Sequence, residues 1–302
     1  MRFFPTVCVC VAFLTSSHAV AESEGAATTV PLPSQRPVAL AAVTNIDGGA
    51  AFLDAALSTA GLRIDEIRRQ TMSVPRIMVS RMPADMHLID NVAARKEIFL
   101  KVMLPLILKV NEEILAERRR LEHLDQVIAS GARLSLHDVA WLDYMASLYG
   151  VESGNLGELL RRVDVVPVAL ALAQSAIESG WGTSRFARNG NAVFGQKSWS
   201  SHAGLVPLNR DPDKTHVVKS FRDLKAAVLA YAGNLNRHSA YAAFRDLRAR
   251  LRASGEPLDS HALATTLDRY AEEPDYISHV HTVIDQNRLT EFDTASLAAL
   301  TA

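Results

Sequence analysis

Apolar and polar residues alternate with a helical period over most of the chain. Between residues 90 and 130, apolar positions such as Leu104 and Leu108 recur at near-helical spacing, with Lys, Glu and Arg between them. An apolar run in this segment is bounded by Lys101 and Lys109, and it is too short to span a bilayer. The pattern therefore predicts a buried core helix, which Pro105 should kink or split in two.

The same pattern predicts further helices on both sides of this segment. A short helix is expected over residues 50–71, then an extended stretch containing Pro75 and Pro83, and later a helix that ends at Gly150. Towards the C-terminus, helices are expected over 241–254, 259–270 and 274–287. The arginines of the first of these three are expected to form a solvated face.

A small β-element interrupts the helices. Two short apolar runs between Gly204 and Phe221 flank the turn-rich sequence "NRDPDK", which is typical of a β-hairpin. The predicted fold is therefore mainly α, with a small β-hairpin lobe and an N-terminal helical extension.

The N-terminal residues have the pattern of a secretory signal peptide. Arg2 is followed by an apolar run and then "AVA", so residues 1–21 are expected to be a signal peptide cut after Ala21. A membrane anchor is the weaker alternative because the run is too short. Both cysteines, Cys8 and Cys10, lie in this signal, which leaves no disulfide or thiolate chemistry for the rest of the chain. Residues 22–49 are rich in Ala, Thr, Pro and Ser and predict a flexible tether.

Composition narrows the class of partners. The 302-residue chain has 48% hydrophobic and 22% charged residues and a net charge of -1, so bulk charge predicts no binding to nucleic acid. We expect no stable membrane insertion after signal cleavage, and a periplasmic or secreted protein. His279 and His281 are two residues apart and would diverge on a helix, so no metal site is predicted there.

The helix expected from residue 168 carries the candidate chemistry. It is apolar almost all round, yet Glu178 falls in its last turn, just before Gly180. The negative end of the helix dipole and burial should both raise the pKa of this carboxyl group. A carboxyl group that keeps its proton near neutral pH is suited to general acid catalysis. The alternative is an ordinary ion pair with Arg185 or Arg188.

Five sequence blocks around this helix resemble one family. They are "AIESGWGTSRFARNGNAVFGQ", "GLVPLNRD", "AYAGNLNRHSAY", "LDRYAEEPDYISHVHTVIDQN" and, before them, "VNEEILAERRRL". Together they are similar to the glucosaminidase family, glycoside hydrolase family 73, and within it to the Bax-like proteins. The resemblance implies a lysozyme-like helical domain over residues 152–290, preceded by an extension at 50–151 and followed by a C-terminal tail at 291–302.

The resemblance also implies site residues. Glu178 matches the general acid, and Tyr276 matches a tyrosine that lines the active site. Substrate-binding positions are expected from Gln174, Trp181, Asn191, Phe194, Gln196 and Tyr270. Some of these positions have a structural alternative: Trp181 as a core aromatic, the two loop amides as loop caps, and Tyr276 as an ordinary aromatic residue at a helix start. The resemblance implies no metal and no cofactor.

This sequence departs from the family at the second carboxylate. Many members carry a second Glu on the hairpin lobe, whereas here no Glu occurs between Glu178 and Glu256. Asp213 is a possible substitute, and the acetamido group of the substrate is another candidate nucleophile. The leading hypothesis is a peptidoglycan hydrolase that cuts the β-1,4 bond after N-acetylglucosamine. The alternatives are a lytic transglycosylase and a non-catalytic cell-wall binding protein.

Overall fold

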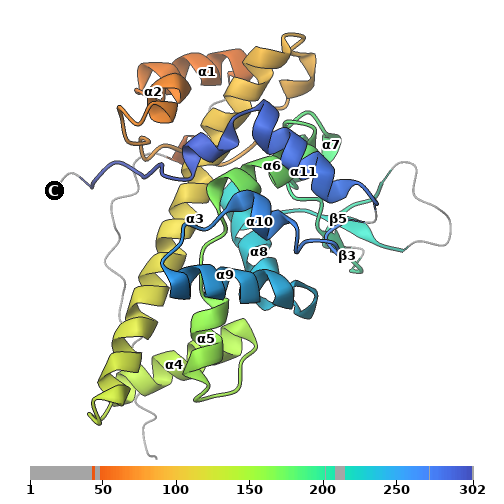
Figure 1. Ribbon diagram of the computed structural model, residues 1–302. Helices are drawn as coiled ribbons and strands as arrows, with labels where there is room; N and C mark the ends of the chain where they lie inside the picture. Colours follow the sequence, from red (N-terminus) through yellow and green to blue (C-terminus); the bar gives the residue numbers. More distant parts are fainter. Residues whose placement is uncertain (1–42, 45–47, 201, 208–214, 272, 301–302) are drawn as a thin grey trace, which may run out of the picture. The chain divides into compact units, whose positions relative to one another are not determined.

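The computed structural model describes residues 43–44, 48–200, 202–207, 215–271 and 273–300, which belong to one compact unit (Figure 1). The predicted signal peptide, nearly all of the predicted tether, and Asp213 lie outside the described residues. The described helices are α1 (Gly49–Thr59), α2 (Ile64–Arg68), α3 (Val92–Ala129), α4 (Leu136–Tyr149), α5 (Leu156–Arg162), α6 (Val168–Ser179), α7 (Arg185–Gly190), α8 (Leu224–Arg237), α9 (Ala242–Ser254), α10 (Ser260–Ala264) and α11 (Tyr276–Gln286). Three 3₁₀ turns join them: η1 (Met86–Leu88), η2 (Ser239–Tyr241) and η3 (Leu289–Phe292).

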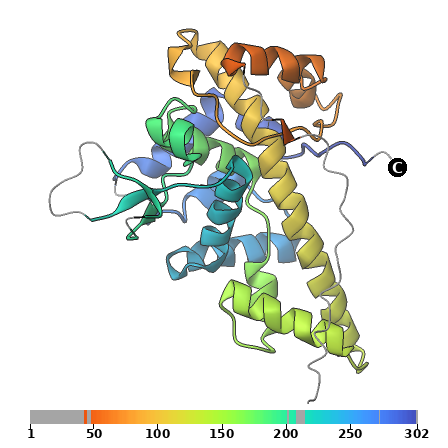
Figure 2. The ribbon, with the colours of Figure 1, turned by 180° about the vertical axis from the view of Figure 1, so that it is seen from behind.

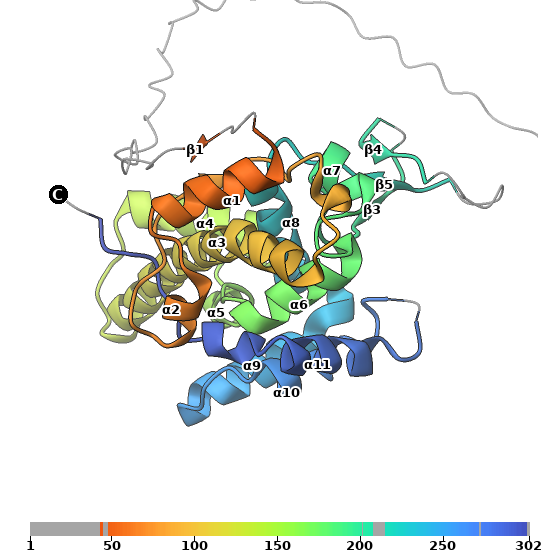
Figure 3. The ribbon, with the colours of Figure 1, turned by 90° about the horizontal axis from the view of Figure 1, so that it is seen from above.

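The extension begins with two helices where one was predicted. Gly61 adopts a left-handed conformation (φ 87°) between α1 and α2, and it ends the first helix. α1 buries Ala50, Leu53 and Leu57 and packs across α3 (Figure 3). The stretch after α2 contains strand β2 (Met78–Val79), which pairs in parallel with β1 (Val43–Thr44).

The long helix α3 runs without a break through Pro105. Of the two outcomes predicted for this proline, a split into two helices is wrong. The residues around it are buried from Ile98 to Leu108, so packing on both sides offsets the local cost of the proline. Among the described residues, no helix is long and apolar enough to cross a membrane.

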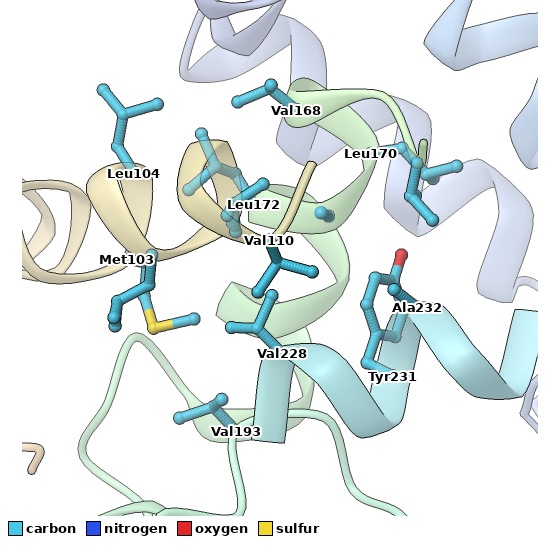
Figure 4. Packing of buried hydrophobic residues seen from close by; sticks show 14 of the residues in the cluster. Met103, Leu104, Val110, Val168, Leu170, Leu172, Val193, Val228, Tyr231 and Ala232 are labelled. Atoms are coloured by element: carbon cyan, nitrogen blue, oxygen red, sulfur yellow. The ribbon is translucent and has the colours of Figure 1, made fainter. Parts of the chain in front are cut away.

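The core is built around α6. Every residue from Val168 to Ala176 is buried, as expected for a helix that is apolar on all faces. α6 contacts α3, α11, α10 and η3, while α3 also packs along α8 (Figure 2). Figure 4 shows side chains of α3, α6, α8 and the loop after α7 interdigitating, among them Met103, Leu104, Val110, Leu170, Leu172, Val193, Val228 and Tyr231.

One apolar cluster extends from Ala50 to Phe292. The predicted boundary between residues 151 and 152 is therefore not a boundary in packing, because α3 and α6 share the same core. The extension forms one wall of the core that holds α6, the helix that carries Glu178.

The segment predicted as a tail is part of this core. Phe292 is fully buried, and the Asp293 Oδ1 atom accepts a hydrogen bond from the Ala169 backbone N–H (2.8 Å). Asp293 thus caps the start of α6 from a position 124 residues away in sequence. The Val74 N–H donates to the Ser296 carbonyl (2.8 Å), which ties the segment to the extension. The predicted tail at 291–302 therefore packs against the rest of the chain as far as residue 298.

The β lobe is a three-stranded antiparallel sheet in the order β3-β5-β4. Its strands are β3 (Lys197–Ser198), β4 (Gly204–Leu205) and β5 (Val217–Lys219). The predicted hairpin is present as β4 and β5, with Leu205 opposite Val218, and β3 joins the other edge of β5. The mainly helical class with a small β lobe and N-terminal helices is confirmed.

The arginines of α9 do not form the predicted solvated face throughout. Arg245 and Arg248 are buried, and their guanidinium groups donate to backbone carbonyls. Arg248 bonds to the carbonyls of Asp164 (3.0 Å) and Val165 (2.9 Å), just before α6. A buried guanidinium with several carbonyl partners is a structural clamp, which a helical-period pattern does not distinguish from a surface charge.

Candidate active site

The helix α6 delivers one carboxyl group to its C-terminal end. Gly180, in the left-handed conformation (φ 58°), ends the helix as predicted, and Glu178 lies in the last turn. The preceding turns are fully buried, whereas Glu178 is half-buried. The rigid core therefore fixes the backbone beneath a carboxyl group that still has access to solvent.

The environment of Glu178 favours its protonated form. The pKa of Glu178 is raised to about 7, chiefly because burial disfavours the charged carboxylate, and the negative charge of Glu273 contributes to this rise. A hydrogen bond from Tyr276 and the positive charge of Lys197 act in the opposite direction. Arg185 donates to the Val206 carbonyl (2.6 Å) and Arg188 to the Thr183 carbonyl (3.0 Å). Arg185 and Arg188, the two residues considered as ion-pair partners of Glu178, thus hydrogen-bond to backbone carbonyls.

Tyr276, the first residue of α11, lies beside Glu178. Its hydroxyl is hydrogen-bonded to the Glu178 carboxyl group, and burial raises the pKa of this phenol well above its usual range. The Gln174 Nε2 atom donates to the Tyr276 Oη atom (2.9 Å), and the Tyr231 hydroxyl donates to the Gln174 Oε1 atom (2.6 Å). A row of hydrogen bonds therefore leads from α8 through α6 to α11 and Glu178.

Aromatic rings hold this row in place. The Tyr270 ring stacks on the Tyr276 ring, with centroids 5.5 Å apart at 15°. The Tyr270 hydroxyl donates to the Phe194 carbonyl (3.2 Å), and the Phe194 ring stacks on Tyr231 at 4.0 Å and 8°. Phe194 and Gln174 are only 2% and 0% exposed. In this structure these two side chains, which were predicted to contact substrate, lie inside the core and support the site from there.

Trp181 faces the extension. Its ring meets the Phe99 ring edge-on, with centroids 5.5 Å apart, and the Lys96 Nζ atom lies 4.8 Å from its centroid. Trp181 itself has a positive φ of 56°, an uncommon conformation for a bulky residue. Contacts with α3 therefore occupy much of the ring that was considered as a sugar platform.

The two loop amides have different environments. Asn191 is buried in the left-handed cap of α7, and its Nδ2 atom donates to the Phe221 carbonyl (3.1 Å). This is the loop-capping role. The Gln196 Oε1 atom is buried and lacks a hydrogen-bond partner among the described residues. Gln196 thus keeps unsatisfied hydrogen-bonding capacity in the loop that leads to the β lobe.

Gly195, next to Gln196, lets the loop approach the carboxyl group closely. Its φ is positive (62°), and a Cβ atom at this position would overlap the Glu178 Oε2 atom. Only glycine satisfies both the conformation and the space. The loop after α7 therefore forms a wall directly against Glu178.

Comparison with known proteins agrees with this geometry. Residues 154–289 match the family model described as "Glucosaminidase: Mannosyl-glycoprotein endo-beta-N-acetylglucosaminidase". This segment is similar to glucosaminidase domains. It contains Glu178, Tyr276 and every other site residue predicted from the family resemblance, which is confirmed at the level of the family.

Two proteins of known name are similar to the chain. "Protein bax" of Escherichia coli (strain K12) is 35% identical over 185 residues, covering 59% of this chain and 64% of that protein. The chain thus matches slightly less than two thirds of the length of this relative. The catalytic domain of the autolysin Auto from Listeria monocytogenes is 16% identical, with a TM-score of 0.32 over 57% of this chain and 96% of that domain.

Three residues near Glu178 were missed by the sequence reasoning. Glu273 and Lys197 act on Glu178 through their charges. Burial raises the pKa of Tyr241, and the negative charge of Glu178 adds to this rise. Glu273 lies in the quoted block "AEEPDY", three residues before Tyr276, so its position was a usable signal. For Lys197 and Tyr241 nothing in the local pattern indicated proximity.

An exposed aromatic side chain also lies on the β lobe. Trp199 is 76% exposed and follows β3, two residues after Lys197. Trp199 lies in the bend just after the strand, and Lys197 on the strand is close enough to Glu178 to influence its charge. Trp199 is therefore an exposed aromatic side chain on the same lobe as Lys197, unlike Phe194, which is buried in the core.

Other features lie apart from Glu178. A cavity of about 470 Å³ is found at the opposite end of α6, lined by Val168, Asp293, Leu258 and Arg252 among others. Within the described part of the chain, no group of three or more His, Cys, Asp or Glu side chains is arranged to hold a metal ion.

Proposed function

We propose that the chain is a glycoside hydrolase that cleaves the β-1,4 bond after N-acetylglucosamine in peptidoglycan, with Glu178 as general acid. The observation that carries the proposal is the half-buried Glu178 whose pKa is raised to about 7 inside a glucosaminidase domain. Peptidoglycan as the substrate rests on the resemblance to the Bax-like branch of the family. Action on the cell wall agrees with the expected periplasmic or secreted location.

The first chemical step follows from this environment. Below about pH 7 the Glu178 carboxyl group holds its proton and transfers it to the oxygen between two sugars as the glycosidic C–O bond breaks. The sugar that keeps the anomeric carbon acquires positive character, while Glu178 becomes a carboxylate. The Tyr276 hydroxyl stabilises that carboxylate by donating a hydrogen bond.

The second step has three candidate groups. Glu273 is a carboxylate whose charge already reaches Glu178, so it is placed to activate water or to stabilise positive charge. Asp213, outside the described residues, is the candidate from the sequence, and the acetamido group of the substrate is the third. Comparing Glu273→Gln with Asp213→Asn separates them, because loss of the group that acts in this step should lower kcat strongly.

The test is digestion of isolated peptidoglycan by the purified protein and by Glu178→Gln, with mass spectrometry of the soluble products. The hydrolase predicts reducing N-acetylglucosamine ends that are lost in Glu178→Gln and retained in Glu256→Gln, an exposed carboxylate on the loop after α9. Equal activity of the wild type and Glu178→Gln would remove Glu178 from the mechanism. Binding to peptidoglycan with no product would favour a cell-wall binding protein.

One observation favours the lytic transglycosylase as a second candidate. In the described β lobe, residues 197–200, 202–207 and 215–219 include no carboxylate. A transglycosylase needs one strong acid and no second carboxylate, because the muramic acid hydroxyl of the substrate attacks in place of water. Anhydro-muramic ends in the same mass spectra would identify this reaction.

A further inference from the structure

The hydrogen bonds behind Glu178 form a buried series with a fixed direction. Tyr231, Gln174 and Tyr276 are 1%, 0% and 3% exposed, so water cannot readily replace a missing partner. The Tyr231 hydroxyl donates to Gln174 Oε1, and Gln174 Nε2 donates to Tyr276 Oη. The hydroxyl of Tyr276 then meets the carboxyl group of Glu178.

The orientation of the Gln174 amide decides what Tyr276 can do. An amide has an acceptor end and a donor end, and a phenol has one proton and acceptor lone pairs. With Nε2 towards Tyr276, the phenol oxygen accepts from Gln174 and its own proton is free for Glu178. With the amide reversed, Tyr276 would donate to Gln174 and could offer Glu178 only a lone pair.

Tyr231 selects between the two orientations. If the amide were reversed, Gln174 would donate to the Tyr231 oxygen, and the Tyr231 proton would be left buried without its acceptor. A buried donor without a partner is costly, so the orientation in which Tyr231 donates to Gln174 is favoured. The Tyr231 ring cannot readily turn away, since it is stacked on Phe194 at 4.0 Å.

We propose that Gln174 is a positioning residue that fixes the Tyr276 hydroxyl as a hydrogen-bond donor to Glu178, with Tyr231 locking the amide. The carboxylate left after proton transfer is then met by a ready donor. The proposal deepens the proposed function of Glu178 and rests on it. The groups that face Glu178 are Tyr276, Glu273 before α11 and Lys197 on β3, and its charge also acts on Tyr241 and Tyr270.

The experiment measures the pKa of Glu178 directly, by NMR titration of the full chain carrying ¹³C-labelled glutamate, with Glu178→Gln used to assign the signal. Tyr231→Phe keeps the ring stack and removes only the locking proton. Gln174 can then reverse and draw the Tyr276 proton away from Glu178. We expect the pKa of Glu178 to rise by about one unit, the size of one hydrogen bond to a charged group.

Four further variants make the result specific. Tyr276→Phe should raise the pKa at least as much, and Tyr231→Phe added to Tyr276→Phe should raise it no further, because Tyr231 acts through Tyr276. Gln174→Met, close in shape but without the amide, removes the donor that polarises the Tyr276 hydroxyl, so it should raise the pKa of Glu178 by less than Tyr276→Phe does. It serves if Tyr231→Phe does not fold. Tyr149→Phe removes another buried hydroxyl, one that donates to Glu117 at 3.1 Å, and should leave the pKa of Glu178 unchanged.

The outcomes separate this proposal from the proposed function. An unchanged pKa in folded Tyr231→Phe, or an equal rise in the Tyr276→Phe background, would overturn the role of Gln174. The titration needs no turnover, so it remains decisive even if the wild type releases no product from peptidoglycan. In an active enzyme, the limb of the kcat/KM profile that reports loss of the Glu178 proton should move to higher pH in Tyr231→Phe by the same amount.

Discussion

Trp181 packs edge-on against Phe99, with ring centroids 5.5 Å apart, and so joins the turn after Glu178 to the long helix of the extension. Trp181 has the positive φ of 56° that bulky residues rarely adopt, and such strain persists only when the surroundings hold it. In the same turn, a Cβ atom at Gly182 would overlap the Met82 sulfur, which shows how closely the extension approaches. The extension therefore supports the position of Glu178.

Phe99→Ala should damage both the fold and the site. Phe99 is 0% exposed, and removing a buried phenyl ring costs about 3–5 kcal/mol in the free energy of unfolding. Because Trp181 loses its partner, kcat per folded molecule should fall as well. Urea unfolding and turnover of peptidoglycan measure the two effects. Phe52→Ala, at a side chain 59% exposed on α1, is the matched control and should change neither. Wild-type turnover per folded Phe99→Ala molecule would show that the extension does not position the site.

The raised pKa of Glu178 should make the protein less stable as pH rises. The folded state binds this proton more tightly than the unfolded state, so its stabilising contribution is present at low pH and is lost as pH rises through about 7. The loss has an upper limit of about 3 kcal/mol. Glu178→Gln lacks the titration, so it should gain stability relative to the wild type between about pH 5 and about pH 8 in denaturant unfolding. Parallel stability profiles for the two proteins would contradict the raised pKa.

Glu273→Gln should move the pH profile to lower values. The negative charge of Glu273 raises the pKa of Glu178, so its removal lets Glu178 lose its proton at a lower pH. The alkaline limb of kcat/KM should therefore shift towards acid, and titration of labelled Glu178 checks the same change without turnover. Glu256→Gln removes an equal charge on the loop after α9 and should leave the limb in place. A shift towards higher pH in Glu273→Gln would show that the two carboxyl groups do not repel each other.

Local sequence patterns were sufficient to predict the elements whose ends are set by residues within the element or next to it. Gly180 and Gly255 both adopt the left-handed conformation at which α6 and α9 end, and this alone places Glu178 in a last turn. The β4–β5 hairpin likewise follows from its own apolar runs and turn residues. In these cases the residues that determine where a helix ends or a hairpin turns lie within a few positions of that end or turn.

Contacts between distant segments could not be read in this way. Asp293 caps α6 from 124 residues away, and Arg248 is buried although its helix alternates charge and apolar residues. The same limit explains why Gln174 was assigned to substrate, since only the folded chain shows that two tyrosines occupy both ends of its amide. The resemblance to the family placed Gln174 in the site, but it did not show which groups the side chain faces.

Trp199→Ala should weaken binding of glycan strands. At 76% exposure on the lobe that carries Lys197, its indole offers a flat apolar surface on which a sugar ring can stack. We expect KM for soluble peptidoglycan fragments to rise, with the pKa of Glu178 unchanged because no hydrogen bond or charge near it is altered. Tyr144→Ala, at an aromatic side chain 60% exposed on α4, is the control. Equal KM values for both variants and the wild type would exclude Trp199 from the binding surface.

Gly195→Ala tests whether the loop after α7 and the carboxyl group must touch. A Cβ atom there would overlap the Glu178 Oε2 atom, so the carboxyl group must leave its place or the loop must retreat. Either change separates Glu178 from the surroundings that keep it protonated, and kcat should fall by about tenfold or more, as displaced catalytic groups commonly show. Gly154→Ala is the matched control, because Gly154 also has a positive φ (83°) but has no atom within 4 Å of an added Cβ. Both variants carry the same backbone strain of about 1–2 kcal/mol, so denaturant unfolding should detect it in each. Only Gly195→Ala should lose activity, and equal loss in both would mean that the strain, and not the contact with Glu178, is responsible.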